Sequence, residues 1–265
     1  MPGLFSPEGL LALSVTLFAG LSTVLGGLAV MRADRSDPRL LALALAFAGG
    51  AMVYVSLVEI LGKSVGALSD VHGEWRGHAL ATLALFAGIG ALAVLDRLLP
   101  NPHADLAGAL PVTEKAAMQR VGLLAAAAIT AHNLPEGMAT FFATLDDPAV
   151  GASLVVAIAL HNVPEGISIA VPVFYATGSR GKAVLATVVA GLAEPVGAVL
   201  GYLILAPILT PTILGLLFGA IAGVMVFLAL DELLPATKRH SAGHETTYGM
   251  VGGMALLAFS LVLLR

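Results

Sequence analysis

Cysteine is absent from this 265-residue sequence. The absence excludes thiolate metal ligands, a disulfide framework and a cysteine nucleophile together. Any metal site must therefore be built from histidine, asparagine and carboxylate side chains. Runs of lysine and arginine are also missing, so no nucleic-acid partner is expected.

Charged residues are scarce as well. They make up 11 % of the sequence, whereas an average soluble protein carries about 25 %. Hydrophobic residues make up 58 %, and the mean hydropathy is +0.95. A soluble fold could not bury that much apolar surface, so the lipid bilayer is an expected partner. At about 20 apolar residues per span, the length allows roughly eight transmembrane helices. No basic segment precedes the first apolar stretch, so we expect it to be retained as the first helix and not cleaved as a signal peptide.

The alternation of apolar runs and polar breaks predicts an all-α membrane protein, a bundle of eight transmembrane helices. The longest polar segment, 100–118, is expected to be a cytoplasmic loop. It is too short to fold separately, so residues 1–265 are predicted to form a single polytopic membrane domain. The expected helices lie near residues 8–31, 38–61, 78–98, 116–144, 149–175, 182–205, 212–234 and 247–264.

Basic residues predict the orientation of this bundle. Of the 13 Lys and Arg residues, ten fall on one side of the eight-helix arrangement and three on the other. Because positive residues concentrate in cytoplasmic loops, both termini are expected outside, on the periplasmic face of a bacterial inner membrane. The cytoplasmic set is Arg32, Arg35, Arg39, Arg97, Lys115, Arg120, Arg180, Lys182, Lys238 and Arg239, and the outer set is Lys63, Arg76 and Arg265.

Glycines recur four residues apart at Gly215, Gly219 and Gly223. Such spacing lets helices approach closely in a membrane. Packing within the chain is the favoured interpretation. The seam of a homodimer is the alternative.

A six-residue pattern, HNxPEG, occurs twice in apolar sequence, at 132–137 and 161–166. In each copy the His and Glu are four residues apart, so both side chains lie on one helix face and can bind one ion. The proline removes a backbone donor and is expected to kink the helix. Non-helical backbone at membrane depth is tolerated only where it is buried in protein or lines a cavity. The two motifs therefore predict a polar cavity near the middle of the membrane.

The side chains of these motifs favour a metal site. Two imidazoles and two carboxylates suit zinc, iron or manganese. Glu194, with the motif asparagines and shared carboxylate oxygens, is expected to hold a second ion, which makes the site binuclear. Three ionised glutamates in the membrane without a cation would cost on the order of 10 kcal/mol, so they are metal-bound or protonated. The predicted metal-site residues are His132, Asn133, Glu136, His161, Asn162, Glu165 and Glu194.

Further polar side chains lie on the second and seventh expected helices, namely Ser56, Glu59, Asp231 and Glu232. A pathway role is one interpretation, in which an ion enters from the outer face, meets the His and Glu site, and leaves toward the cytoplasm past the three carboxylates. A structural role, between helices or at a helix end, is the alternative.

Two other function classes fit the sequence less well. An intramembrane metal-dependent hydrolase is possible in principle, because zinc held by His and carboxylates also activates water. Such an enzyme should carry HExxH or GxSxG, and the sequence has neither. A metal-gated sensor would need an appended soluble domain, which the loops cannot hold. No GxxxxGK[ST] phosphate loop is present, which disfavours direct ATP drive within the chain.

At these motifs the chain resembles the ZIP family, the Zrt- and Irt-like metal transporters, and within it the bacterial ZupT-like branch. The similar segments are HNLPEGMATF from His132, HNVPEGISIA from His161, GLAEPVG around Glu194, VSLVEIL around Glu59, LDRLLP around Asp96 and ALDELLP around Asp231. The resemblance implies eight helices with both termini outside. It also implies His132, Glu136, His161 and Glu165 as primary ligands, with Asn133, Asn162 and Glu194 completing an adjacent second site.

We therefore expect a multi-pass transporter of the bacterial inner (plasma) membrane and not an enzyme. Its expected substrates are divalent metal ions carried toward the cytoplasm, Zn²⁺ first and also Fe²⁺, Mn²⁺, Co²⁺ and Cd²⁺. These ions are cargo, and no cofactor is expected.

Overall fold

The computed structural model describes residues 2–29, 31, 38–98, 130, 133–146, 148–241 and 243–263. Every regular element within these ranges is a helix, as the composition predicted. Residues 133–146 form a helix that we call the 133–146 helix. The other elements are α1 (Pro7–Ala29), α2 (Pro38–Tyr54), η1 (Val55–Ile60), α3 (Leu61–His72), α4 (Glu74–Leu98), α7 (Pro148–Thr177), α8 (Arg180–Leu205), α9 (Pro211–Leu228), η2 (Ala229–Leu233), α10 (Leu234–His240) and α11 (Glu245–Leu263).

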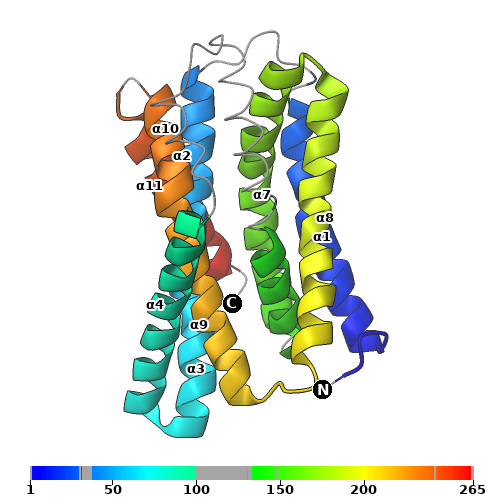
Figure 1. Cartoon of the computed structure of the whole chain (residues 1–265), viewed down its shortest axis with the longest axis vertical. Coiled ribbons are helices and arrows are strands. Elements are labelled where there is room, and N and C mark those ends of the chain that lie inside the picture. Colours follow the sequence, from blue (N-terminus) through cyan, green and yellow to red (C-terminus); the bar gives the residue numbers. More distant parts are fainter. Residues whose placement is uncertain are drawn as a thin grey trace.

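The helices gather in two groups that stand side by side (Figure 1). In the first group α1 packs against both α7 and α8, and the 133–146 helix lies against α8. In the second group α2 packs against α11, and α9 packs against both α3 and α4. Both α2 and α11 also touch α7, so α7 connects the two groups. The segments that carry the two HNxPEG motifs and Glu194 belong to the first group.

Two helices are longer than predicted. We expected the second helix to end near residue 61, but α2, η1 and α3 run on without a break to His72. The polar residues after position 61 do not end the helix, because Ser64 is buried and donates to the Gly215 carbonyl of α9 (2.7 Å). The first break is Gly73, whose φ of 83° suits glycine. Lys63, predicted to lie in a loop, therefore lies in α3.

The seventh predicted helix is extended in the same way. We ended it near residue 234, but α9 and η2 continue into α10 as far as His240. Pro235 lies in the first turn of α10. This turn directly follows the π turn η2, where the regular i to i−4 hydrogen bonds are already interrupted, so the missing N–H of the proline does not end the helix.

Membrane spans can be counted only within the described residues. Six helices there are long and apolar enough to cross a membrane: Pro7–Leu28, Leu45–His72, Glu74–Val94, Arg180–Leu205, Pro211–Asp231 and Glu245–Val262. The other two expected spans correspond to the 133–146 helix and α7. The predicted cytoplasmic loop at 100–118 lies outside the described residues. A multi-pass membrane protein is thus supported, and the total of eight spans stays a prediction.

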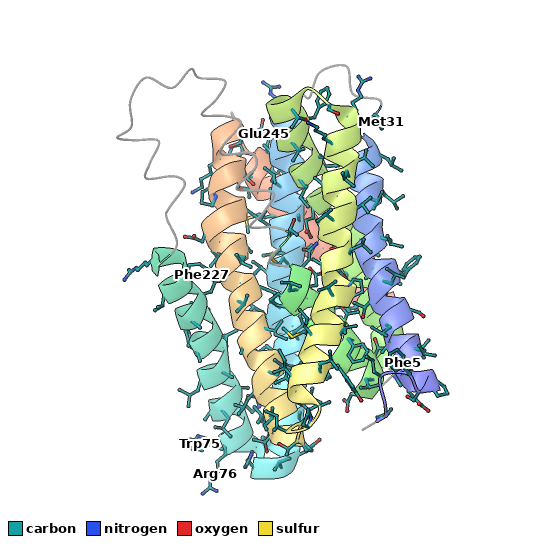
Figure 2. All side chains as sticks on the ribbon, turned by 45° about the vertical axis from the view of Figure 1, so that its right-hand side comes forward. Phe5, Met31, Trp75, Arg76, Phe227 and Glu245 are labelled. Atoms are coloured by element: carbon teal, nitrogen blue, oxygen red, sulfur yellow. The ribbon has the colours of Figure 1, made fainter. Side chains whose placement is uncertain are left out.

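Two of the basic residues can be placed at the ends of the bundle. Glu245 and Met31 lie at one end of the molecule, and Arg76 lies at the other (Figure 2). Arg39 approaches Glu245 to 3.9 Å, which places Arg39 at the first end. Arg39 and Arg76, assigned to opposite sides from the sequence, therefore lie at opposite ends. Which end faces the cytoplasm stays a prediction.

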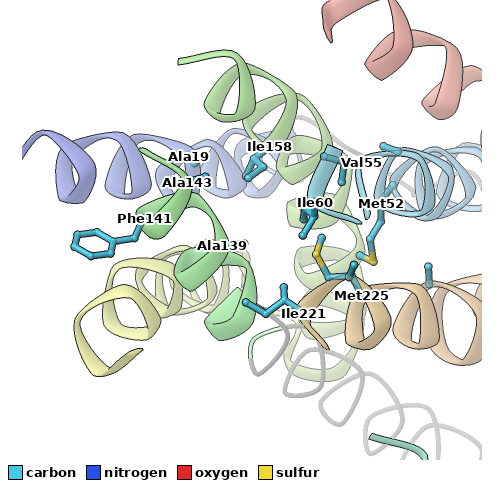
Figure 3. Close-up of a cluster of buried hydrophobic side chains, with 14 of the residues drawn as sticks. Ala19, Met52, Val55, Ile60, Ala139, Phe141, Ala143, Ile158, Ile221 and Met225 are labelled. Atoms are coloured by element: carbon cyan, nitrogen blue, oxygen red, sulfur yellow. The ribbon is translucent and has the colours of Figure 1, made fainter. Parts of the chain in front are cut away.

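Part of the buried apolar core is shown in Figure 3. Met52 of α2 and Ile60 of η1 lie close to Met225 of α9, while Ala19 of α1 lies close to Ile158 of α7. All five side chains are at most 2 % exposed. Because lipid tails are as apolar as these side chains, close packing holds such helices together.

Glycine provides the closest contacts between helices of the second group. A Cβ added to Gly88 of α4 would overlap the Ala220 carbonyl of α9, and one added to Gly223 of α9 would overlap the Leu85 carbonyl of α4. Gly215 and Gly219 likewise face α3, with Gly219 also against α4. The glycine series is therefore used inside the chain, as we favoured.

The substitution Gly88→Ala is expected to destabilise the bundle by about 1–3 kcal/mol, because the added methyl group pushes α9 away from α4. The measurement is the midpoint of thermal unfolding in detergent. Gly90→Ala on the same helix is the matched control, since nothing lies within 4 Å of its added Cβ. Alanine is the better helix former, so this control should keep or raise the midpoint. Equal midpoints for the two variants would contradict the close contact.

Candidate metal centre

Five of the seven predicted ligands lie in the buried interior of the first group. Asn133, Glu136, Asn162 and Glu194 are 0 % exposed, and Glu165 is 1 % exposed. They come from the 133–146 helix, α7 and α8, which the chain connects over more than sixty residues. The structure therefore brings together polar side chains that the sequence predicted to share a site.

The two motif asparagines connect neighbouring helices. Asn133 Nδ2 donates to the Ala190 carbonyl of α8 (3.0 Å), and Asn162 Nδ2 donates to the Ala19 carbonyl of α1 (2.9 Å). Asn162 Nδ2 also donates to Glu194 Oε1. These bonds fix both carboxamide groups. Their Oδ1 atoms are buried and have no hydrogen-bond partner among the residues that the structure describes, so they are available as oxygen ligands.

The last residue of each motif has a packing role that the sequence analysis missed. A Cβ on Gly137 would overlap the Glu194 carbonyl of α8, and a Cβ on Gly166 would overlap the Thr23 carbonyl of α1. Backbone therefore touches backbone one turn after each asparagine. The repeated glycine was a visible signal, but its partner helix could not be read from the sequence.

Three carboxyl groups share this region. Glu194 interacts electrostatically with Glu136 and Glu165, which also interact with each other, and the Asn133 side chain lies beside the Glu165 carboxyl. A charge at the bilayer centre costs about 2.5–3.5 kcal/mol on insertion scales, and repulsion between like charges adds to that cost. A cation bound among the three groups would offset both.

The two motif histidines, unlike the other five predicted ligands, have no described side chain. His132 lies outside the described residues, and His161 lies in α7, one turn before Glu165, with its side chain outside the described part. Among the side chains that are described, no three from His, Cys, Asp and Glu are grouped closely enough to hold one ion. The carboxylates alone thus do not complete a metal site. The ligand roles and the polar cavity stay predictions.

Both segments of the second group that carry the predicted pathway residues contain a π-helical turn. Ser56 and Glu59 lie in η1, and Asp231 and Glu232 lie in η2, with the Glu232 side chain outside the described part. Ser56 and Glu59 are buried, whereas Asp231 is exposed. η1 packs against α9 and η2 packs against α2. Single π turns often mark functional positions, and apolar periodicity gives no sign of them.

Comparisons with known proteins extend over nearly the whole chain. A family model described as ZIP Zinc transporter matches residues 101–261. The zinc transporter ZupT of Xanthomonas axonopodis pv. citri is 57 % identical over 258 residues, which cover 96 % of this chain and 95 % of the relative. The zinc transporter ZupT of Neisseria meningitidis serogroup B is 57 % identical over 266 residues, 99 % of each chain. That of Corynebacterium efficiens is 51 % identical over 258 residues, covering 95 % of this chain and 96 % of the relative.

The substitution Asn162→Leu is expected to lower the free energy of unfolding by about 1–3 kcal/mol, because it removes donors from the Ala19 carbonyl and the buried Glu194 carboxyl. Thermal unfolding in metal-free detergent measures the change. The control is Ser14→Ala on α1, whose exposed hydroxyl donates only to Leu10 of its own helix (2.8 Å). If Asn162→Leu and Ser14→Ala unfold at the same midpoint, the asparagine does not hold the helices together.

Proposed function

This chain belongs to the ZIP zinc transporter family, as the motifs predicted, and we propose that it imports divalent metal ions, zinc first, through the buried site described above. The comparisons point to a transporter and not to an enzyme, so the hydrolase alternative is set aside. The observation that carries the proposal is the gathering of three buried carboxyl groups and two carboxamides from three helices in an apolar interior.

The proposed ligand set combines nitrogen and oxygen donors. Each motif histidine precedes its glutamate by one helical turn, so His132 with Glu136 and His161 with Glu165 form two pairs of ligands. Glu194 and the oxygens of Asn133 and Asn162 form the adjacent second site. Such donors also accept Fe²⁺, Mn²⁺, Co²⁺ and Cd²⁺, which we propose as further substrates.

The proposed direction is from the periplasm to the cytoplasm across a bacterial inner membrane. Its support is the distribution of basic residues, because the eight-helix arrangement predicted from the sequence puts ten of the 13 on the side opposite both termini. Beyond the site, the ion leaves past Glu59, Asp231 and Glu232. Of the two π turns that hold these carboxylates, η1 continues α2 and packs against α9, and η2 continues α9 and packs against α2. The glycine series packs within the chain and so does not supply a dimer seam. A homodimer stays a prediction.

Uptake of radioactive zinc into proteoliposomes tests the proposal. Wild-type protein should show saturable uptake, with iron, manganese, cobalt and cadmium as competitors. Both His132→Ala with His161→Ala and Glu136→Gln with Glu165→Gln should abolish it, because each double change removes two ligands. Glu74→Gln, an exposed carboxylate at the start of α4, is the control that keeps full uptake. Zinc binding without any flux in the wild type would contradict a carrier.

The pathway assignment predicts a different kinetic effect. Glu59→Gln and Asp231→Asn are expected to lower the maximal rate of zinc uptake about tenfold while the zinc affinity of the purified protein stays at the wild-type value. The reason is that these groups attract the ion only after it leaves the site. Asp70→Asn, an exposed carboxylate of α3, serves as the control. A full rate in both pathway variants would assign Glu59 and Asp231 a structural role.

A further inference from the structure

The first group of helices contains an internal repeat that relates α1 to α8. In the 133–146 helix, an asparagine and the glycine four residues later contact α8 at two positions four residues apart. In α7, the same two residue types contact α1 in the same way. The corresponding contacts are Asn133 with Ala190 and Gly137 with Glu194 in one half, and Asn162 with Ala19 and Gly166 with Thr23 in the other.

The correspondence extends beyond these contacts. A Cβ on Gly197 of α8 would overlap the Leu134 carbonyl, and a Cβ on Gly26 of α1 would overlap the Val163 carbonyl. Both glycines lie seven residues after the carbonyl that accepts from asparagine. The two segments align without a gap as AGLSTVLGG (19–27) and AGLAEPVGA (190–198). Local sequence and packing therefore agree on the same pairing of positions.

The two halves meet at their own equivalent residues. Gly20 of α1 and Gly191 of α8 are paired by this alignment, and a Cβ on either would overlap the carbonyl of the other. α1 and α7 run in one direction along the bundle, and α8 runs in the opposite direction (Figure 1). Inverted repeats of this kind bind their substrates where the halves meet. The alignment makes Thr23 of α1 the equivalent of Glu194 of α8.

The Thr23 hydroxyl lacks the hydrogen bond within its own helix that Thr16 of the same helix makes. Thr23 is 0 % exposed, and its Oγ1 has no hydrogen-bond partner among the described residues. A helical threonine ordinarily donates to the carbonyl four residues earlier, as Thr16 does to Ala12 (2.9 Å). For Thr23 that acceptor is the Ala19 carbonyl, which already accepts from Ser22 Oγ (2.6 Å) and Asn162 Nδ2 (2.9 Å). The buried hydroxyl is thus left for a ligand.

We propose that Thr23 is a neutral oxygen donor to the transported ion, the α1 counterpart of Glu194. Glu194 accepts from Asn162, and the repeat pairs Asn162 with Asn133, whose Oδ1 also has no hydrogen-bond partner among the described residues. A threonine hydroxyl ends two bonds short of a glutamate oxygen, so threonine at this position fills less of the interior than glutamate would. The inference deepens the proposed function and rests on it.

The neutral donor also limits the charge of the site. With glutamate at both equivalent positions, four carboxylates would face the ions, and with threonine there are three. A transported ion must bind well enough to enter and weakly enough to leave. The hydroxyl at position 23 therefore provides a ligand without the attraction of a fourth charge.

Zinc titration calorimetry of the purified protein tests the inference. Thr23→Val keeps the shape of the side chain and removes the oxygen, so the zinc dissociation constant should rise about tenfold. Thr23→Ser should restore the affinity toward the wild-type value. Thr16→Val, another buried threonine of α1, is the matched control and should bind as the wild type does. Thermal unfolding without metal should show Thr23→Val at least as stable as the wild type, because no hydrogen bond is lost.

An exchange of the paired residues tests the repeat itself. Thr23→Glu combined with Glu194→Thr should recover part of the zinc binding that Glu194→Thr alone loses. A double exchange that binds no better than the single variant would count against the equivalence of the two positions. Wild-type affinity in Thr23→Val would overturn the role of the hydroxyl while zinc uptake by the wild type still supports the transporter. A wild type that neither binds nor carries zinc would overturn the proposed function itself. That result differs from a failure of the Thr23 role alone, in which the wild type still carries zinc.

Discussion

Direct contact between helix backbones is the constraint on which the candidate site depends. Gly137 and Gly166 let the motif helices touch α8 and α1, and Gly20 meets Gly191 where these two helices cross. At such short separation, the side-chain amides of the asparagines reach carbonyls on the neighbouring helix. Any larger residue at these glycines would move the helices apart and with them the carboxyl groups.

The glycine contacts and the asparagine hydrogen bonds explain why the carboxylates can remain in the membrane. Glu136, Glu165 and Glu194 are held by three different helices, so they cannot separate without breaking the glycine contacts and the amide bonds. Burial raises the cost of their charges, and their mutual repulsion adds to it. A divalent cation bound among these groups would offset both costs.

The sequence predicted what depends on residue type and local spacing. Apolar runs located the helices, and the two HNxPEG motifs with Glu194 identified side chains that the fold brings together. It did not show the partners of Gly137 and Gly166 or the π turns at Glu59 and Asp231, because these depend on which helices become neighbours. The helix ends near 61 and 234 were wrong, because the polar residue Ser64 is buried against α9 and the chain stays helical through Pro235 to His240.

The most direct test of this account is anomalous diffraction at the zinc edge from crystals grown with zinc. A zinc ion should be bound between the 133–146 helix, α7 and α8, with nitrogen and oxygen ligands at about 2.0–2.2 Å. Carboxyl oxygens of Glu136 and Glu165 should be among these ligands. Zinc bound only at surface histidines, with none between these three helices, would contradict it.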